Sequence, residues 1–75
     1  MNSGAILSPM PGTVRKVLVR ERERVREGEA LVVVEAMKME HTLRAAFAGV
    51  VETVKVFEGD SVAKGVELVV VKEEE

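Results

Sequence analysis

Residues 12–35 are GTVRKVLVRERERVREGEALVVVE, and residues 49–72 are GVVETVKVFEGDSVAKGVELVVVK. A shift of 37 residues places the first segment on the second without a gap, and 11 of the 24 aligned pairs are identical. The identical pairs include glycines as well as valines, for example Gly12 with Gly49, so a shared richness in valine does not explain them. The chain therefore contains two copies of one unit.

Each unit has the pattern of a strand, a turn, a short strand, a second turn and a last strand. The β-branched runs predict first strands at residues 13–19 and 50–56, and last strands at residues 30–35 and 66–72. A short valine-centred strand is expected between them in each copy. These runs predict an all-β fold.

One segment has the composition of a helix, residues 19–29 with the sequence VRERERVREGE. Its partner in the second copy contains Gly59 and Gly65, which oppose a helix. We therefore expect a turn region there.

The first strands do not alternate regularly. Val14 and Val17 lie three residues apart, and Val51 and Val54 repeat this spacing. Residues three apart in a regular strand point to opposite faces. The spacing predicts a β-bulge, or a strand that changes sheets, at the same place in both copies.

Neither unit can bury its apolar face alone, so the two should pack as a small sandwich or flattened barrel with a pseudo-two-fold axis. The 75 residues are enough for one domain, residues 1–75, built from repeats 12–35 and 49–72. Phe47 and Phe57 are the only aromatic residues, which predicts an aliphatic core.

The segment between the two units, Ala36-Met37-Lys38-Met39, has no counterpart in the repeat. A two-residue loop at Met37 and Lys38 would set three cross-strand pairs: Ala36 with Met39, Glu35 with Glu40, and Val34 with His41. Such loops favour positive φ at both central residues, for which Asn-Gly is the comfortable sequence. Met-Lys is strained there, which suggests that the tip has a function. The two-fold relation places Lys38 at one end and both chain termini at the other.

The 11 basic and 13 acidic residues give a net charge of −2 and are spread along the chain, which argues against nucleic acid or membrane partners. No cysteine and only one histidine, His41, are present, so no metal site is expected. The N-terminal sequence lacks the charged and apolar regions of a signal peptide, and a cytoplasmic location is expected. Enrichment in Glu, Arg and Val further suggests a thermophilic source.

Residues 35–40, EAMKME, resemble the attachment site of the biotinyl domains of biotin-dependent carboxylases. SPMPGTV at 8–14 and AFAGVVETVKVFEGDSVAKGVELVVV at 46–71 are also similar to that family. The resemblance implies a barrel-sandwich hybrid of two four-stranded antiparallel sheets, with Lys38 at a hairpin tip. It also implies that a biotin protein ligase attaches biotin to Lys38.

In the family, the biotin ring takes up a carboxyl group at a biotin carboxylase site and delivers it at a carboxyltransferase site. The resemblance therefore implies a carrier rather than an enzyme, with covalent biotin as its cofactor. The tethered arm gives both sites a high effective concentration of the carried group. The residues implied in ligase recognition flank the lysine: Glu35, Ala36, Met37, Met39 and Glu40.

Two departures from the family pattern stand out. The family often has Gly-Asp in the turn of the first unit, as Gly59-Asp60 in the second unit, but Arg22-Glu23 stand here. We expect that loop to differ in shape. The gapless repeat also leaves no room for the protruding thumb of some acetyl-CoA carboxylase carriers. This favours the thumbless type of acyl-CoA and pyruvate carboxylases and related decarboxylases.

Three other functions compete with the biotin carrier. A lipoyl carrier would share the fold and the lysine, but it usually has Asp and Ala beside the lysine where Met37 and Met39 stand. A structural or interaction module would not need a lysine at the tip. An independent enzyme is disfavoured because the sequence shows no nucleophile–base pair, metal cluster or phosphate loop.

Overall fold

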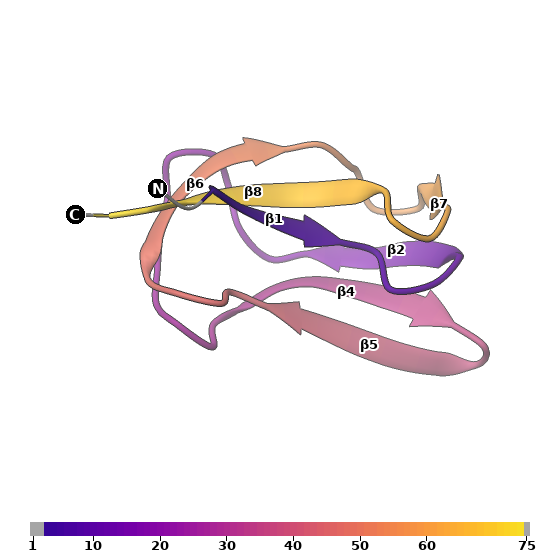
Figure 1. The fold of residues 1–75 in the computed structure, drawn as a ribbon. Helices are drawn as coiled ribbons and strands as arrows, with labels where there is room; N and C mark the ends of the chain where they lie inside the picture. Colours follow the sequence, from indigo (N-terminus) through magenta and orange to yellow (C-terminus); the bar gives the residue numbers. More distant parts are fainter. Residues whose placement is uncertain (1–2, 75) are drawn as a thin grey trace.

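The computed structural model describes residues 3–74, which form eight strands in two four-stranded antiparallel sheets (Figure 1). The strands are β1 (Ser3–Leu7), β2 (Gly12–Val17), β3 (Arg24–Val25), β4 (Ala30–Ala36), β5 (Met39–Arg44), β6 (Gly49–Val54), β7 (Ser61–Val62) and β8 (Glu67–Glu73). This architecture confirms the expected all-β fold. Residues 3–74 contain no helix, and therefore none that is long and apolar enough to cross a membrane.

The two sheets interlock the two copies of the repeat. Their strand orders are β1-β8-β6-β3 and β5-β4-β2-β7. The shift of 37 residues relates β1 to β5, β2 to β6, β3 to β7 and β4 to β8, so it exchanges one sheet for the other. Each sheet therefore takes two strands from each half of the chain.

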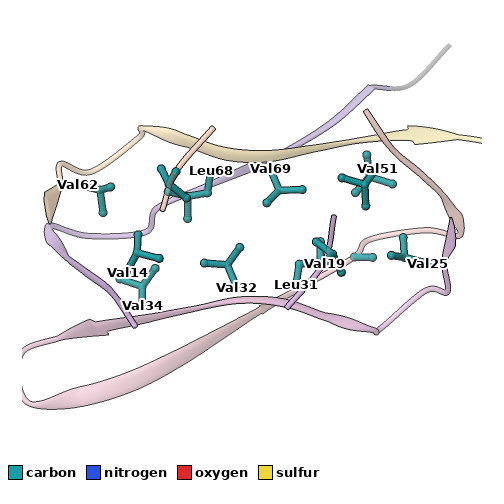
Figure 2. Packing of buried hydrophobic residues seen from close by; sticks show 13 residues of the cluster. Val14, Val19, Val25, Leu31, Val32, Val34, Val51, Val62, Leu68 and Val69 are labelled. Carbon is teal, nitrogen blue, oxygen red and sulfur yellow. The ribbon is translucent and has the colours of Figure 1, made fainter. Parts of the chain in front are cut away.

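The core between the sheets is aliphatic, and it consists largely of pairs of equivalent residues (Figure 2). Leu31 and Leu68 are equivalent and fully buried, as are Val14 and Val51. Phe47 lies at the margin of this cluster, and Phe57 is 79% exposed. Apolar burial is the dominant favourable term in folding, and here both copies supply it from the same positions.

The predicted bulges are present in both copies. The β2–β4 register shifts between Val14 and Lys16, and the β6–β8 register shifts between Val51 and Thr53. Each bulge inserts one residue, so that the valines on both sides of it can face the core. Val14 is accordingly buried in the core, and Val17 packs against it.

The predicted first strands were too long by two residues at their C-terminal ends. β2 ends at Val17 and β6 ends at Val54. Residues 19–29 form turns around the short strand β3, which confirms that this segment is not helical.

The expectation that the loop at Arg22 differs in shape was wrong. Arg22 has a φ of 74°, and its equivalent Gly59 has a φ of 95°. The Arg22 N–H donates to the carbonyl oxygen of Val51 at 2.7 Å, and the Gly59 N–H donates to that of Val14 at 2.7 Å. The two loops therefore share one backbone conformation, because hydrogen bonds to equivalent strand residues fix both.

The molecule is elongated, with extents of 37 × 19 × 19 Å. The turn between β4 and β5 lies at one end, whereas the beginning of β1 and the end of β8 lie at the opposite end (Figure 1). This confirms the arrangement inferred from the repeat for residues 3–74; residues 1, 2 and 75 lie outside the described residues. We call the half of the molecule that carries the β4–β5 turn the tip half.

Candidate functional site

The site is the two-residue turn that connects β4 to β5. Met37 and Lys38 have φ values of 53° and 66°, so both central residues are in the left-handed region. This is the conformation of a type I′ hairpin turn, and it confirms the sequence prediction. Residues with a Cβ adopt this region only at an energetic cost, which the flanking strand pairs must offset.

The register of the hairpin is as predicted. Three cross-strand pairs lead away from the turn: Ala36 with Met39, Glu35 with Glu40, and Val34 with His41. Val34 and Ala36 are buried, with 0% and 4% of their surface exposed. The base of the turn is therefore anchored in the molecule while the turn itself projects from it.

The tip is open to solvent. Met37 is 83% exposed and Met39 is 63% exposed, and Lys38 between them is also exposed. Within residues 3–74 the Lys38 ammonium group has no hydrogen-bond or ion-pair partner. Its amine is therefore accessible to another molecule.

A glycine in β2 supports the base of the turn. β5 is an edge strand, so β4 joins the hairpin to the rest of its sheet through β2. A Cβ on Gly12 would lie 2.4 Å from the carbonyl oxygen of Glu35 and 3.0 Å from the Cβ of Ala36. β2 can lie against the end of β4 only because residue 12 has no side chain. In the sequence, Gly12 stands out only as the equivalent of Gly49, and nothing there connects it with the tip.

Charged residues lie beside the turn on the strands. The carboxylates of Glu35 and Glu40 are on directly opposite residues of the hairpin, an arrangement that costs about 0.2–1 kcal/mol between like charges. The Nε of Arg15 lies 3.2 Å from Oε1 of Glu35, but both side chains are about half exposed and the pair is screened by solvent. Arg15 was not expected at the site from the sequence.

His41 is the remaining polar residue of the hairpin near the tip. Its Nε2 is buried and has no hydrogen-bond partner among residues 3–74. The side chain is thus directed into the structure and is not displayed beside Lys38. No group of three His, Cys, Asp or Glu residues in the described part of the chain could hold a metal ion.

Comparison with known proteins agrees with this geometry. The model of the biotin-requiring enzyme family matches residues 4–71. The chain belongs to this family of proteins. It is a biotin carboxyl carrier domain, a carrier rather than a catalytic domain, and its cofactor is covalently attached biotin.

Two similar proteins illustrate the relationship. The chain is 47% identical over 70 residues to the methylcrotonoyl-CoA carboxylase subunit alpha, mitochondrial, of Oryza sativa subsp. japonica, covering 93% of this chain and 10% of that protein. It is 41% identical over 70 residues to the biotin carboxyl carrier protein of acetyl-CoA carboxylase of Solanum lycopersicum, covering 93% of this chain and 100% of that sequence.

A single-chain, multi-domain long-chain acyl-CoA carboxylase of known structure superposes with a TM-score of 0.88 at 36% identity, covering 96% of this chain and 7% of that one. The chain thus spans about a tenth of the methylcrotonoyl-CoA carboxylase subunits that it matches.

Proposed function

We propose that Lys38 is the residue that carries biotin. The observation that supports this most directly is the exposed, unpaired Lys38 side chain on a strained turn, between two exposed methionines. Strain at a surface turn persists where a function requires it. An Asn-Gly sequence would relieve the strain but would remove the amine.

The attachment is an amide bond made in trans. A biotin protein ligase first joins biotin to AMP, with release of pyrophosphate from ATP. The Lys38 Nζ, after loss of a proton to the ligase site, attacks the biotinyl carbonyl carbon; the new C–N bond forms as the C–O bond to AMP breaks. The turn of this chain supplies an amine in an accessible position and no catalytic group.

The residues around Lys38 are proposed to be the ligase recognition motif. Met37 and Met39 offer flexible thioether side chains on the surface, where they can adapt to a partner. Ala36 is buried and fixes the backbone beside them. Glu35 and Glu40 remain opposite each other despite their like charge, which favours a role in contacting a partner over a role in stability.

Biotin, when bound, supplies a ring that carries a carboxyl group. We propose that this domain, residues 1–75 built from repeats 12–35 and 49–72, moves that group between the biotin carboxylase and carboxyltransferase sites of a biotin-dependent carboxylase or decarboxylase. The connection between β2 and β4 contains only turns and the two-residue β3. This supports the thumbless type found in acyl-CoA and pyruvate carboxylases.

The test is modification of the 75-residue chain by a purified biotin protein ligase with biotin and ATP. Intact mass should increase by one biotinyl group, that is, biotin less one water, and streptavidin should bind the product. The variant Lys38→Arg should show neither change while keeping the melting temperature of the wild type. Unmodified wild-type protein, or a biotinylated Lys38→Arg variant, would refute the assignment. Modification by a lipoate ligase instead would favour the lipoyl carrier.

Two further proposals rest on the sequence alone. We propose a cytoplasmic location, although the rice relative is described as mitochondrial. A thermophilic source follows from the enrichment in Glu, Arg and Val; the relatives named above do not support it. A melting temperature within the range of about 45–65 °C that is usual for mesophilic domains would count against it.

A further inference from the structure

The two ends of the molecule have the same backbone but different surfaces. Residues 20–29, RERERVREGE, and residues 57–66, FEGDSVAKGV, are equivalent under the repeat. Equivalent backbone hydrogen bonds hold them, for example from Gly28 N–H to the Ala45 carbonyl and from Gly65 N–H to the Ser8 carbonyl, both 2.8 Å. The two segments therefore have the same backbone conformation and differ only in their side chains, so each can serve as a control for the other.

The two segments lie in opposite halves. The 57–66 segment is bonded to Val14 through Gly59, and Val14 lies with Val34 and Val62 in the tip half (Figure 2). The 20–29 segment is bonded to Val51, which lies in the other half. Segment 57–66 is thus in the half that presents Lys38.

Segment 57–66, which lies in the tip half, carries fewer charges than its equivalent at the other end. Eight of the ten residues 20–29 are charged, but only three of the ten residues 57–66 are: Glu58, Asp60 and Lys64. Of the six large hydrophobic residues that are exposed in residues 3–74, five belong to the β4–β5 turn, to segment 57–66 or to the end of β1 that pairs beside this segment: Leu7, Met37, Met39, Phe57 and Val66. Three of them have a charged residue at the equivalent position of the other copy: Arg44 for Leu7, Arg20 for Phe57 and Glu29 for Val66.

Phe57 is the exposed apolar residue that differs most clearly from its equivalent. It is 79% exposed, and its N–H donates to Oδ2 of Asp60 at 2.8 Å, just as the Arg20 N–H donates to Oε1 of Glu23 at 2.9 Å. The turn therefore accepts an arginine without a change of backbone. Because the Phe57 side chain is 79% exposed, it buries little apolar surface, and packing within the chain does not explain an aromatic residue at this place.

We infer that the tip half is a docking surface for the enzyme that acylates Lys38, and that Phe57 is an apolar contact in that interface. The inference rests on the proposed modification of Lys38. Depletion of charge with enrichment in Met and Phe is the compositional mark of a protein interface. A standard interface covers about 800 Å² per partner, far more than one turn, so it extends from Lys38 onto neighbouring loops.

We identify the partner that occupies this surface as the ligase, because an unmodified lysine side chain is short. An unmodified lysine has only its own four-carbon side chain to enter an active site, so the ligase surface must close around the tip. Enzymes that use the finished, longer biotinyl arm can act from a greater distance. The ligase must therefore contact the tip half closely, whereas the partners that act on the biotinylated domain need not.

The test exchanges residues between the two ends. Phe57→Arg introduces the residue that the other copy has at Arg20, and Phe57→Gln removes the ring without adding charge. The matched control is Leu18→Lys, which introduces the residue found at its equivalent Lys55. Leu18 is 47% exposed and lies in the other half, where its N–H donates to the Leu31 carbonyl. Biotinylation kinetics are measured with a purified ligase, ATP and biotin at varied carrier concentration.

We expect both Phe57 variants to raise the KM for the carrier about tenfold with kcat little changed, as for loss of an interface hot spot. Leu18→Lys should leave KM unchanged, and all variants should keep the wild-type melting temperature. An unchanged KM in both Phe57 variants would overturn the docking surface while wild-type biotinylation still upheld the proposed function. A raised KM in Phe57→Arg alone would indicate charge repulsion and overturn the apolar contact.

A second copy of this chain is the alternative occupant. Light scattering of the wild type and Phe57→Arg, each at high concentration, distinguishes the two. A monomer in both cases agrees with ligase docking. A wild-type dimer that dissociates in Phe57→Arg would show that the surface serves self-association, and would overturn the proposal.

Discussion

Arg22 and Gly59 occupy the same position in the two copies of one turn, and both have a positive φ, 74° and 95° respectively. Glycine adopts this region freely, whereas arginine places a Cβ close to the backbone. The hydrogen bond from Arg22 N–H to the Val51 carbonyl nonetheless holds the first copy in the conformation of the second. The first copy therefore stores backbone strain that the second does not.

Replacing Arg22 with glycine should stabilise the protein. Relief of the positive-φ strain is expected to raise the free energy of unfolding by up to about 1 kcal/mol. For a domain of this size that corresponds to an increase of about 4–8 °C in melting temperature, measurable by circular dichroism. The reciprocal variant Gly59→Ala should lower the melting temperature. If Arg22→Gly is less stable than the wild type, the arginine side chain stabilises the loop by more than the strain costs.

The Met37-Lys38 turn should also become more stable when its positive-φ residues are replaced, but the replacement should abolish its function. The double variant Met37→Asn with Lys38→Gly provides the sequence that a type I′ turn prefers. It should be more stable to denaturant, by about 1 kcal/mol, and should not accept biotin. Met37→Asn alone, which retains Lys38, serves as the control: it should still accept biotin, but more slowly than the wild type because Met37 belongs to the proposed recognition motif. A double variant that unfolds earlier would mean that the Met37 or Lys38 side chain stabilises the hairpin.

Gly12 and Gly49 offer a matched pair of variants. A Cβ on Gly49 would lie 2.2 Å from the Lys72 carbonyl oxygen, as one on Gly12 would lie 2.4 Å from that of Glu35. Alanine at either position should cost about 1–3 kcal/mol of stability through overpacking. At a temperature where both variants are folded, only Gly12→Ala should slow biotinylation, because it displaces the residues just before Met37. Equal biotinylation rates in the two variants would show that Gly12 has no part in presenting Lys38.

His41 should be replaceable without loss of modification. A buried polar atom without a partner costs about 1–3 kcal/mol, and among residues 3–74 the His41 Nε2 has none. His41→Leu should therefore keep or increase the free energy of unfolding in urea, and it should leave the rate of biotinylation unchanged. Slower biotinylation at equal stability would give His41 a part in recognition that its burial does not suggest.

The hairpin that carries Lys38 was predictable in detail because local chemistry determines it. The cross-strand pair of Ala36 with Met39 and the positive φ of Met37 and Lys38 follow from a two-residue loop between two β runs. The bulge between Val14 and Lys16 was also predictable, because the spacing of the valines indicates which residues must face the core.

Contacts between distant strands were not predictable from local pattern. β1 was not identified from the repeat, since Ser3–Leu7 shares no identical residue with its equivalents in β5. The shape of the Arg22 loop was wrongly expected to differ, because propensity counts the strain of arginine but not the hydrogen bond to Val51. The support of the tip by Gly12 depends on how closely β2 approaches β4, which no sequence pattern specifies.

The exchange of strands between the sheets has a consequence for the place of the site. Because each sheet needs two strands from each half of the chain, two separate copies of a half-length peptide could satisfy the same pairing as a symmetric homodimer. In the present chain the two halves are joined at the β4–β5 connection. Lys38 therefore belongs to the one segment that the pairing between the halves does not require.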